Sequence, residues 1–170
     1  MSKKSTGTLR GNDLILTRSF KAPIADVWTS VTKSEHTERW FGRWEGDARP
    51  GNTIRILMVF EQGDAWTNAT INKCEEPHHL DLTTRSAYGE WHLELKLRED
   101  NGTTHVELVH HLTDRKGIGE LGPGWEYYMD MLAHAREGTP KPVWDDYYPA
   151  LKDDYVARGA SAPSGSGPAS

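Results

Sequence analysis

The sequence predicts an α+β domain in which a curved antiparallel sheet is covered on one face by a late helix. Between Ile54 and Leu112, apolar and polar residues alternate with period two, which is typical of strands that have one buried and one hydrated face. Turn sequences such as Glu76-Pro77 and Asn101-Gly102 separate these segments. From Trp125 to Leu132 the apolar residues recur instead at helical spacing. We therefore expect the apolar face of this helix to pack against the apolar face of the sheet.

About six strands are expected. The first runs from Asp13 to Phe20 and ends before Pro23, which fixes φ and suits the first turn of a helix. The other five are expected at residues 54–60, 66–74, 80–84, 91–97 and 106–112. The outward positions of the later strands carry charged residues and histidines, so one side of the sheet faces water.

Two short helices follow the first strand. Ile24, Val27, Trp28 and Val31 form one apolar stripe, which predicts the first of them. The second carries Trp40 and Phe41 and stops at Gly42. Both helices interrupt the sheet early in the chain.

The long C-terminal helix is expected to follow a glycine-rich connection, Gly117 to Gly124, with Pro123 at its first position. It ends near Gly138, because Pro140 and Pro142 forbid continuation. A last short helix, from about Pro149 to Gly159, is expected to brace the face of the long helix that points away from the sheet.

These segments divide the chain into one domain with additions. Residues 1–10 are polar and are expected to be a disordered N-terminus, and residues 11–138 form the domain. Residues 139–160 form a helical C-terminal extension. Residues 161–170 contain only small residues, proline and glycine, which bury nothing, so this tail is expected to be disordered.

Composition excludes several classes of partner. A net charge of -5 removes the attraction to phosphate on which nucleic-acid binding depends. No segment approaches the ~20 apolar residues of a membrane span. A single cysteine, Cys74, and a polar N-terminus favour a cytoplasmic location. The chain is expected to be a monomer or a weak homodimer without nucleic-acid or membrane partners.

Several spaced residues resemble those of a known superfamily. They are Arg18-Ser19-Phe20-Lys21-Ala22-Pro23, Val27-Trp28, Thr32, Glu35-His36, Trp40-Phe41, the stretch 75–82 with Pro77 and Leu80, and Gly124-Trp125. In this spacing the chain resembles the Bet v1/START-like superfamily, in the branch of the C-terminal domain of the activator of Hsp90 ATPase. The resemblance covers residues 12 to 137.

The resemblance implies a helix-grip fold, in which the sheet wraps around the long C-terminal helix and leaves a cavity for apolar molecules. Relatives include aromatases or cyclases, simple binding proteins, and proteins that capture a toxic antibiotic. A fold shared by such different activities leaves the function to be argued from the site.

The strand phase and the resemblance together predict an apolar, tryptophan-rich ligand site. Its expected residues are Trp40, Met58, Trp66, Leu82, Trp91, Leu93, His110, Leu112, Trp125 and Met129. Trp66 is the weakest of these by phase, because both faces of its strand mix polar and apolar residues. Asn68, Thr70 and Thr84 are further polar groups for the site.

His110 is the one catalytic candidate, because it shares the inward phase and imidazole can shuttle protons near neutral pH. The alternative is a core histidine bonded to a neighbour. No metal is expected: neighbours such as His110 and His111 point to opposite faces, and His105 lies too far from His111 without help from another strand. No phosphate-binding or dinucleotide motif appears, so no cofactor is expected.

The leading hypothesis is therefore the binding of a hydrophobic small molecule, such as a polyketide, a lipid or an aromatic metabolite, with sequestration of a toxic compound as one purpose. An aromatase- or cyclase-like enzyme acting in the same cavity is an alternative. An Hsp90-type interaction module is another. If the chain captures a reactive antibiotic, the Cα–H bonds of Gly117 to Gly124 are candidate sacrificial hydrogen donors.

Overall fold

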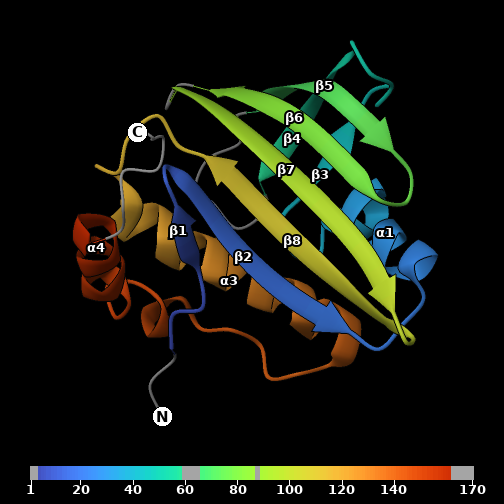
Figure 1. The fold of residues 1–170 in the computed structure, drawn as a ribbon. Coiled ribbons are helices and arrows are strands. Elements are labelled where there is room, and N and C mark those ends of the chain that lie inside the picture. Colours follow the sequence, from blue (N-terminus) through green and yellow to red (C-terminus); the bar gives the residue numbers. More distant parts are fainter. Residues whose placement is uncertain (1–3, 59–65, 87–88, 162–170) are drawn as a thin grey trace.

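Eight strands form one continuous antiparallel sheet in the part of the chain that the structure, a computed structural model, describes, namely residues 4–58, 66–86 and 89–161 (Figure 1). The strands are β1 (Thr8–Arg10), β2 (Asp13–Phe20), β3 (Gly42–Glu45), β4 (Thr53–Met58), β5 (Thr67–Glu75), β6 (His79–Ser86), β7 (Gly89–Asp100) and β8 (Thr103–His111). Their order is β1-β2-β8-β7-β6-β5-β4-β3. Strand β2, near the start of the chain, therefore pairs with β8, the last strand in the sequence.

The α+β class is confirmed, but the sheet has more strands than the six that the sequence predicts. The additional strands are β1 and β3, with three and four residues. Segments this short hold too few residues to display a period of two. The predicted turn at residues 62–64 lies outside the described residues.

The predicted inward phase of the central strands is confirmed. Leu93, Leu95 and Leu97 of β7 are buried, and so are Val106 and Leu108 of β8. The strand register places Leu93 beside Leu82 on one side and His110 on the other, so inward residues form rows across the sheet. These rows form the concave, apolar floor of the domain.

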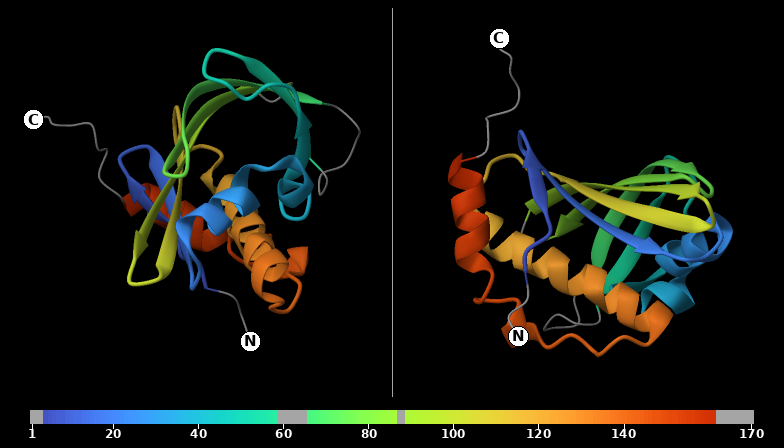
Figure 2. Two further views of the ribbon diagram at one scale, coloured as in Figure 1. Left: turned by 90° about the vertical axis from the view of Figure 1, so that its right-hand side faces the viewer. Right: turned by 60° about the horizontal axis from the view of Figure 1, so that its bottom comes forward.

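Helices α1 (Ile24–Thr32) and α2 (Ser34–Thr37) follow β2, as the sequence predicts. In α1 the buried residues are Val27, Trp28 and Val31, the predicted apolar stripe. Helix α2 has a single turn and leads through Trp40 into β3. Together they cover one end of the curved sheet (Figure 2).

The long helix α3 (Ile118–Glu137) runs along the concave side of the sheet (Figure 2). It begins five residues before Pro123, so the predicted start at this proline is wrong, and most of the expected glycine connection is helical. Pro123 lies inside the helix without an N–H to donate, and a proline ring crowds the preceding turn, a cost that tertiary packing of this first part of the helix must offset. The helix ends as predicted, at Gly138 in the left-handed conformation (φ 68°).

The C-terminal extension contains a 3-10 turn, η1 (Trp144–Asp146), and helix α4 (Lys152–Ser161). Tyr127 of α3 contacts the rings of Trp144 and Tyr147 edge-on, at 5.3 and 5.5 Å between centroids. Tyr155 of α4 is fully buried, and a Cβ on Gly122 would lie 2.4 Å from its ring. Gly122 therefore serves close packing against α4, and so does Gly119, where a Cβ would lie 2.9 Å from the side chain of Val156.

The N-terminal segment lies against the domain from residue 4 onward, and Thr8–Arg10 of it form β1; residues 1–3 lie outside the described part. Thr6 and Gly7 of this segment contact Glu126 of α3, which is 1% exposed. The Glu126 carboxylate accepts hydrogen bonds from the backbone N–H of Gly7, from the hydroxyl groups of Thr6 and Tyr155, and from Arg18. The buried Glu126 carboxylate thus links the N-terminal segment, β2, α3 and α4. No pattern in the sequence predicts this connection.

Within the described residues, no helix combines the length and apolarity needed to cross a membrane. The tail after Ser161 lies outside the described part.

Candidate functional site

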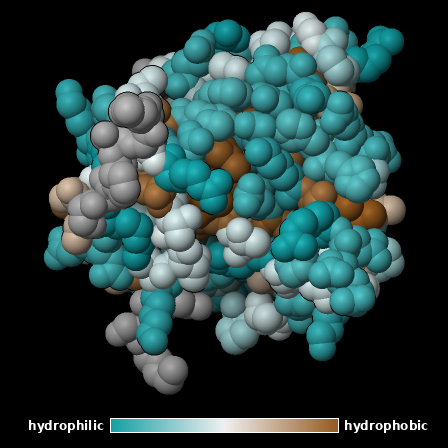
Figure 3. Space-filling model, in the orientation of Figure 1, coloured by the Kyte–Doolittle hydropathy of each residue, from teal (hydrophilic) through white to brown (hydrophobic). Residues whose placement is uncertain are grey.

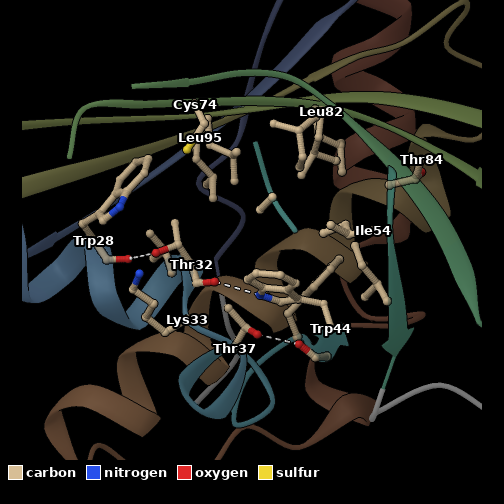
Figure 4. A pocket seen from close by; sticks show the side chains of 18 of the residues that line it. Trp28, Thr32, Lys33, Thr37, Trp44, Ile54, Cys74, Leu82, Thr84 and Leu95 are labelled. Carbon is tan, nitrogen blue, oxygen red and sulfur yellow. Dashed lines mark hydrogen bonds between the residues drawn. The ribbon is translucent and has the colours of Figure 1, made fainter. Parts of the chain in front are cut away.

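A cavity of about 550 Å³ lies between the concave face of the sheet, helices α1 and α2, and helix α3 (Figure 4). Its volume is within the range of sites for drug-sized ligands. The helical side and the loops supply Trp28, Val31, Thr32, Lys33, Thr37, Trp40, Phe41, Asp47, Ala48, Glu76 and Trp125. The strands supply Gly42, Trp44, Ile54, Ile56, Ile71, Cys74, Leu80, Leu82, Thr84, Leu93, Leu95 and Leu108, and Gly46 completes the wall.

Aromatic rings form much of the helical wall. Phe41 stacks on Trp125 with centroids 5.8 Å apart and an interplanar angle of 9°, and Trp40 lies 5.5 Å from Phe41. Two indole N–H groups of the lining are directed at backbone carbonyl groups. Trp40 donates to the carbonyl of Ser30 at 3.0 Å, and Trp44 donates to that of Thr32 at 2.8 Å. These two rings therefore offer a ligand their carbon surfaces.

Two threonine hydroxyl groups of the wall also bond within the protein. Thr32 donates to the carbonyl of Trp28 at 2.6 Å, and Thr37 donates to that of Gly42 at 2.7 Å (Figure 4). The charged lining residues, Lys33, Asp47 and Glu76, are exposed. The interior is consequently apolar, and charge is confined to the rim.

Cys74 is the nucleophile that the lining offers. Burial raises the pKa of its thiol, the Glu76 carboxylate raises it further, and Lys33 acts in the opposite direction. A thiol with a raised pKa remains protonated at neutral pH and reacts poorly. This position suits packing against a ligand better than covalent chemistry.

The structure brings four of the ten predicted site residues to this cavity: Trp40, Leu82, Leu93 and Trp125. Met129 is fully buried in the core behind it, and Met58 and Leu112 are half-buried beside the core. The ring centroid of Trp91 lies 6.3 Å from that of Trp125, but Trp91 is not part of the cavity lining.

Trp66 lies on the outer side of the sheet, in contrast to the prediction. The guanidinium of Arg55 sits 4.5 Å from its ring centroid, and Arg55 is an exposed residue of β4. Ala69 and Ile71 of the following strand are buried, and Trp66 has the opposite phase, which the mixed polar and apolar character of both faces hides in the sequence. Asn68 and Thr70 share this outward phase, while Thr84 does line the cavity.

His110 faces inward as its phase predicts, but it does not belong to the cavity lining. Its side chain is buried, and Nδ1 accepts a hydrogen bond of 3.0 Å from the indole of Trp125. Burial lowers the pKa of His110 to about 4, with a smaller effect from His111 and His92. The neutral ring therefore holds Trp125 in place, so the sequence alternative of a bonded core histidine describes this geometry better than a catalytic role does.

Trp28 and Trp44 line the cavity although neither was among the predicted site residues. Trp28 belongs to the apolar stripe of α1, and it packs in the core, at 2% exposed. Helical spacing identifies a buried face but cannot tell a filled core from the wall of a cavity. Trp44 belongs to β3, the short strand that the pattern does not reveal.

Comparisons with known proteins identify the family and the fold of the chain. Residues 21–137 match the family model described as "Activator of Hsp90 ATPase homolog 1-like protein". CalU16 from Micromonospora echinospora has 26% identity and a TM-score of 0.74, over 88% of this chain and 89% of CalU16. A protein from Bordetella parapertussis, encoded by BPP1335, has 21% identity and a TM-score of 0.74, over 93% and 95%.

DynU16, described as a protein in the dynemicin biosynthetic locus, has 20% identity and a TM-score of 0.65. The match covers 78% of this chain and 50% of DynU16. No curated protein matches the chain. The helix-grip fold and the START-like resemblance are confirmed, and the fold is of a ligand-binding kind. With the family model matching more than half of its length, the chain belongs to the family of activator of Hsp90 ATPase homolog 1-like proteins.

Proposed function

We propose that the protein binds a flat, hydrophobic small molecule, such as an aromatic polyketide, in the cavity between sheet and helices, and thereby sequesters it. One observation carries the proposal: a cavity of about 550 Å³ whose interior is aromatic and aliphatic and whose charges lie at the rim. Burial of a drug-sized apolar ligand there would supply micromolar affinity, about -8 kcal/mol.

The arrangement of the wall favours an aromatic ligand. Trp28, Trp40 and Trp125 are at most 4% exposed, so their rings are held by the fold. Rigid rings bind a flat apolar molecule without a large loss of side-chain entropy. A flexible lipid would lose more conformational freedom in the same volume.

The origin of one structural neighbour supports a small-molecule ligand: DynU16 is described as a protein in the dynemicin biosynthetic locus. Sequestration requires only binding, and the described lining residues contain no histidine and no deeply placed carboxylate that would favour catalysis. This supports a binding role over the cyclase-like alternative.

The experiment is a titration of the full chain with a panel of anthraquinones and fatty acids, followed by calorimetry. Phe41→Ala removes a half-buried ring of the wall and is expected to weaken binding of the aromatic members about ten-fold, because each such contact contributes about 1 kcal/mol or more.

Trp144→Ala is the matched control, because it also removes a large ring but from η1, outside the cavity, where Trp144 is 43% exposed. It is expected to leave the affinity unchanged. Failure of every panel member to bind the wild-type chain, or equal losses in the two variants, would contradict the proposal. Tighter binding of fatty acids than of anthraquinones would change the ligand class.

A further inference from the structure

We propose that the outer face of the sheet, opposite the cavity, binds a divalent transition ion, with zinc as the representative, through His92, Glu94 and His111. The nitrogen and oxygen ligand atoms that these residues offer all lie within 4.8 Å of one another. Two imidazoles and one carboxylate form a donor set that zinc commonly uses.

Strand register brings the three side chains together. His92 of β7 is paired directly with His111 of β8, and their ring centroids are 4.4 Å apart. Glu94 follows His92 on the same face of β7 and approaches His111 Nε2 with one carboxylate oxygen at 2.5 Å. The spacing of histidines along β8 alone does not form a metal site. The neighbouring strand β7 adds His92 and Glu94 beside His111.

Tetrahedral zinc places its ligand atoms about 3.4 Å apart, since its bonds to nitrogen and oxygen measure roughly 2.0–2.2 Å. Small side-chain rotations from the observed positions would reach this geometry. The two strands that carry the donors, β7 and β8, are interior strands of the sheet and hydrogen-bonded on both sides, so the backbone beneath the site is held in place.

Each imidazole already has a carboxylate partner of the kind that supports metal ligands. His111 Nδ1 lies 2.7 Å from Asp13, and His92 Nε2 lies 2.8 Å from Asp81. In metal sites such outer partners fix the ring orientation and strengthen the ligand. Asp13 and Asp81 also add negative charge around the position of a cation.

The site is open to solvent on one side. The side chains of Glu94, His111 and His92 are 12%, 29% and 43% exposed, in that order. This face of the molecule is largely hydrophilic (Figure 3). An ion could therefore enter from water and keep a water molecule as its fourth ligand.

A second group, His79, Asp81 and Glu94, shares Glu94 with the proposed site but offers only one imidazole. The set of His92, Glu94 and His111 is therefore the better zinc site.

The test is calorimetric titration of the full chain, stripped with EDTA, with zinc chloride at neutral pH. The expected result is one ion per chain, with affinity about ten-fold or more weaker in His92→Gln and in Asp13→Asn. His92 is partly exposed, so its replacement is expected to preserve the fold, which circular dichroism checks. Loss of zinc affinity in a folded His92→Gln chain supports the site.

His105→Gln is the matched control. His105 is another β8 histidine of the same face, hydrogen-bonded to Ser19 rather than to the cluster. It should not alter the affinity. Absence of saturable binding up to about 100 µM zinc, equal losses in the His92 and His105 variants, or an unchanged affinity in His92→Gln would overturn the proposal.

Discussion

Replacement of Glu126 by glutamine is expected to destabilise the fold by about 3 kcal/mol. The carboxylate is buried, lies 2.9 Å from Arg18, and otherwise faces only donors, from Thr6, Gly7 and Tyr155. An amide keeps the size but removes the negative charge and turns an NH₂ group toward donors. Removing one member of a buried ion pair costs roughly 3–5 kcal/mol. The low end applies because Arg18 keeps Asp130 at 3.0 Å.

The loss should depend on pH. Burial alone would raise the pKa of Glu126, but the hydrogen bonds from Tyr155, Thr6 and Arg18 bring it below its ordinary value of 4.5. A lowered folded-state pKa gives stability that is present above the unfolded value and is lost as pH falls through the folded value. The difference between wild type and Glu126→Gln should therefore be full above pH 4.5 and shrink below it.

Urea denaturation of both chains at neutral pH and at about pH 3 measures this difference. Glu120→Gln is the control, because Glu120 lies on the same helix, is 56% exposed and only approaches Lys152 at 3.7 Å. It should change stability by no more than about 0.5 kcal/mol. A Glu126→Gln chain as stable as the Glu120→Gln chain at neutral pH, or a difference that does not change with pH, would refute the reasoning.

Three other outcomes follow from the structure. Gly122→Ala should cost about 1–3 kcal/mol in urea denaturation, because its Cβ would meet the Tyr155 ring at 2.4 Å, whereas Gly124→Ala, with no atom within 4 Å, should not destabilise. His110→Leu should cost about 1–3 kcal/mol by leaving the Trp125 indole without its acceptor, and a smaller loss would contradict that role. The Cys74 thiol, with its raised pKa, should be alkylated slowly in the folded chain and quickly in urea; equal rates would contradict its burial.

Much of the fold was predictable because strand phase is a local property. The inward rows of β6, β7 and β8, including Leu82, Leu93 and His110, follow directly from alternation. The short strands β1 and β3 were not predictable in this way. The start of α3 was missed because Pro123 is a local signal, while packing of the helix start against α4 is a tertiary one.

The position of the cavity was only partly predictable. Phase tells which face a residue joins, but it does not tell which end of the concave face is filled by side chains from other elements. His110 and Trp91 lie at an end filled by Trp125, whereas Trp28 and Trp44 border open volume under α1 and α2. The pairing of His92 with His111 likewise depends on register between strands, which spacing along one strand does not contain.

The central claim, that an apolar molecule binds in the cavity between sheet and helices, is tested most directly by the indole N–H signals of the seven tryptophans in nitrogen-correlated NMR spectra during ligand titration. The largest shifts are expected at the lining residues Trp28, Trp40, Trp44 and Trp125. Trp66, on the outer side, and Trp144, in the extension, should not shift. Shifts confined to Trp66 or Trp144, with the four lining signals unchanged, would contradict the claim.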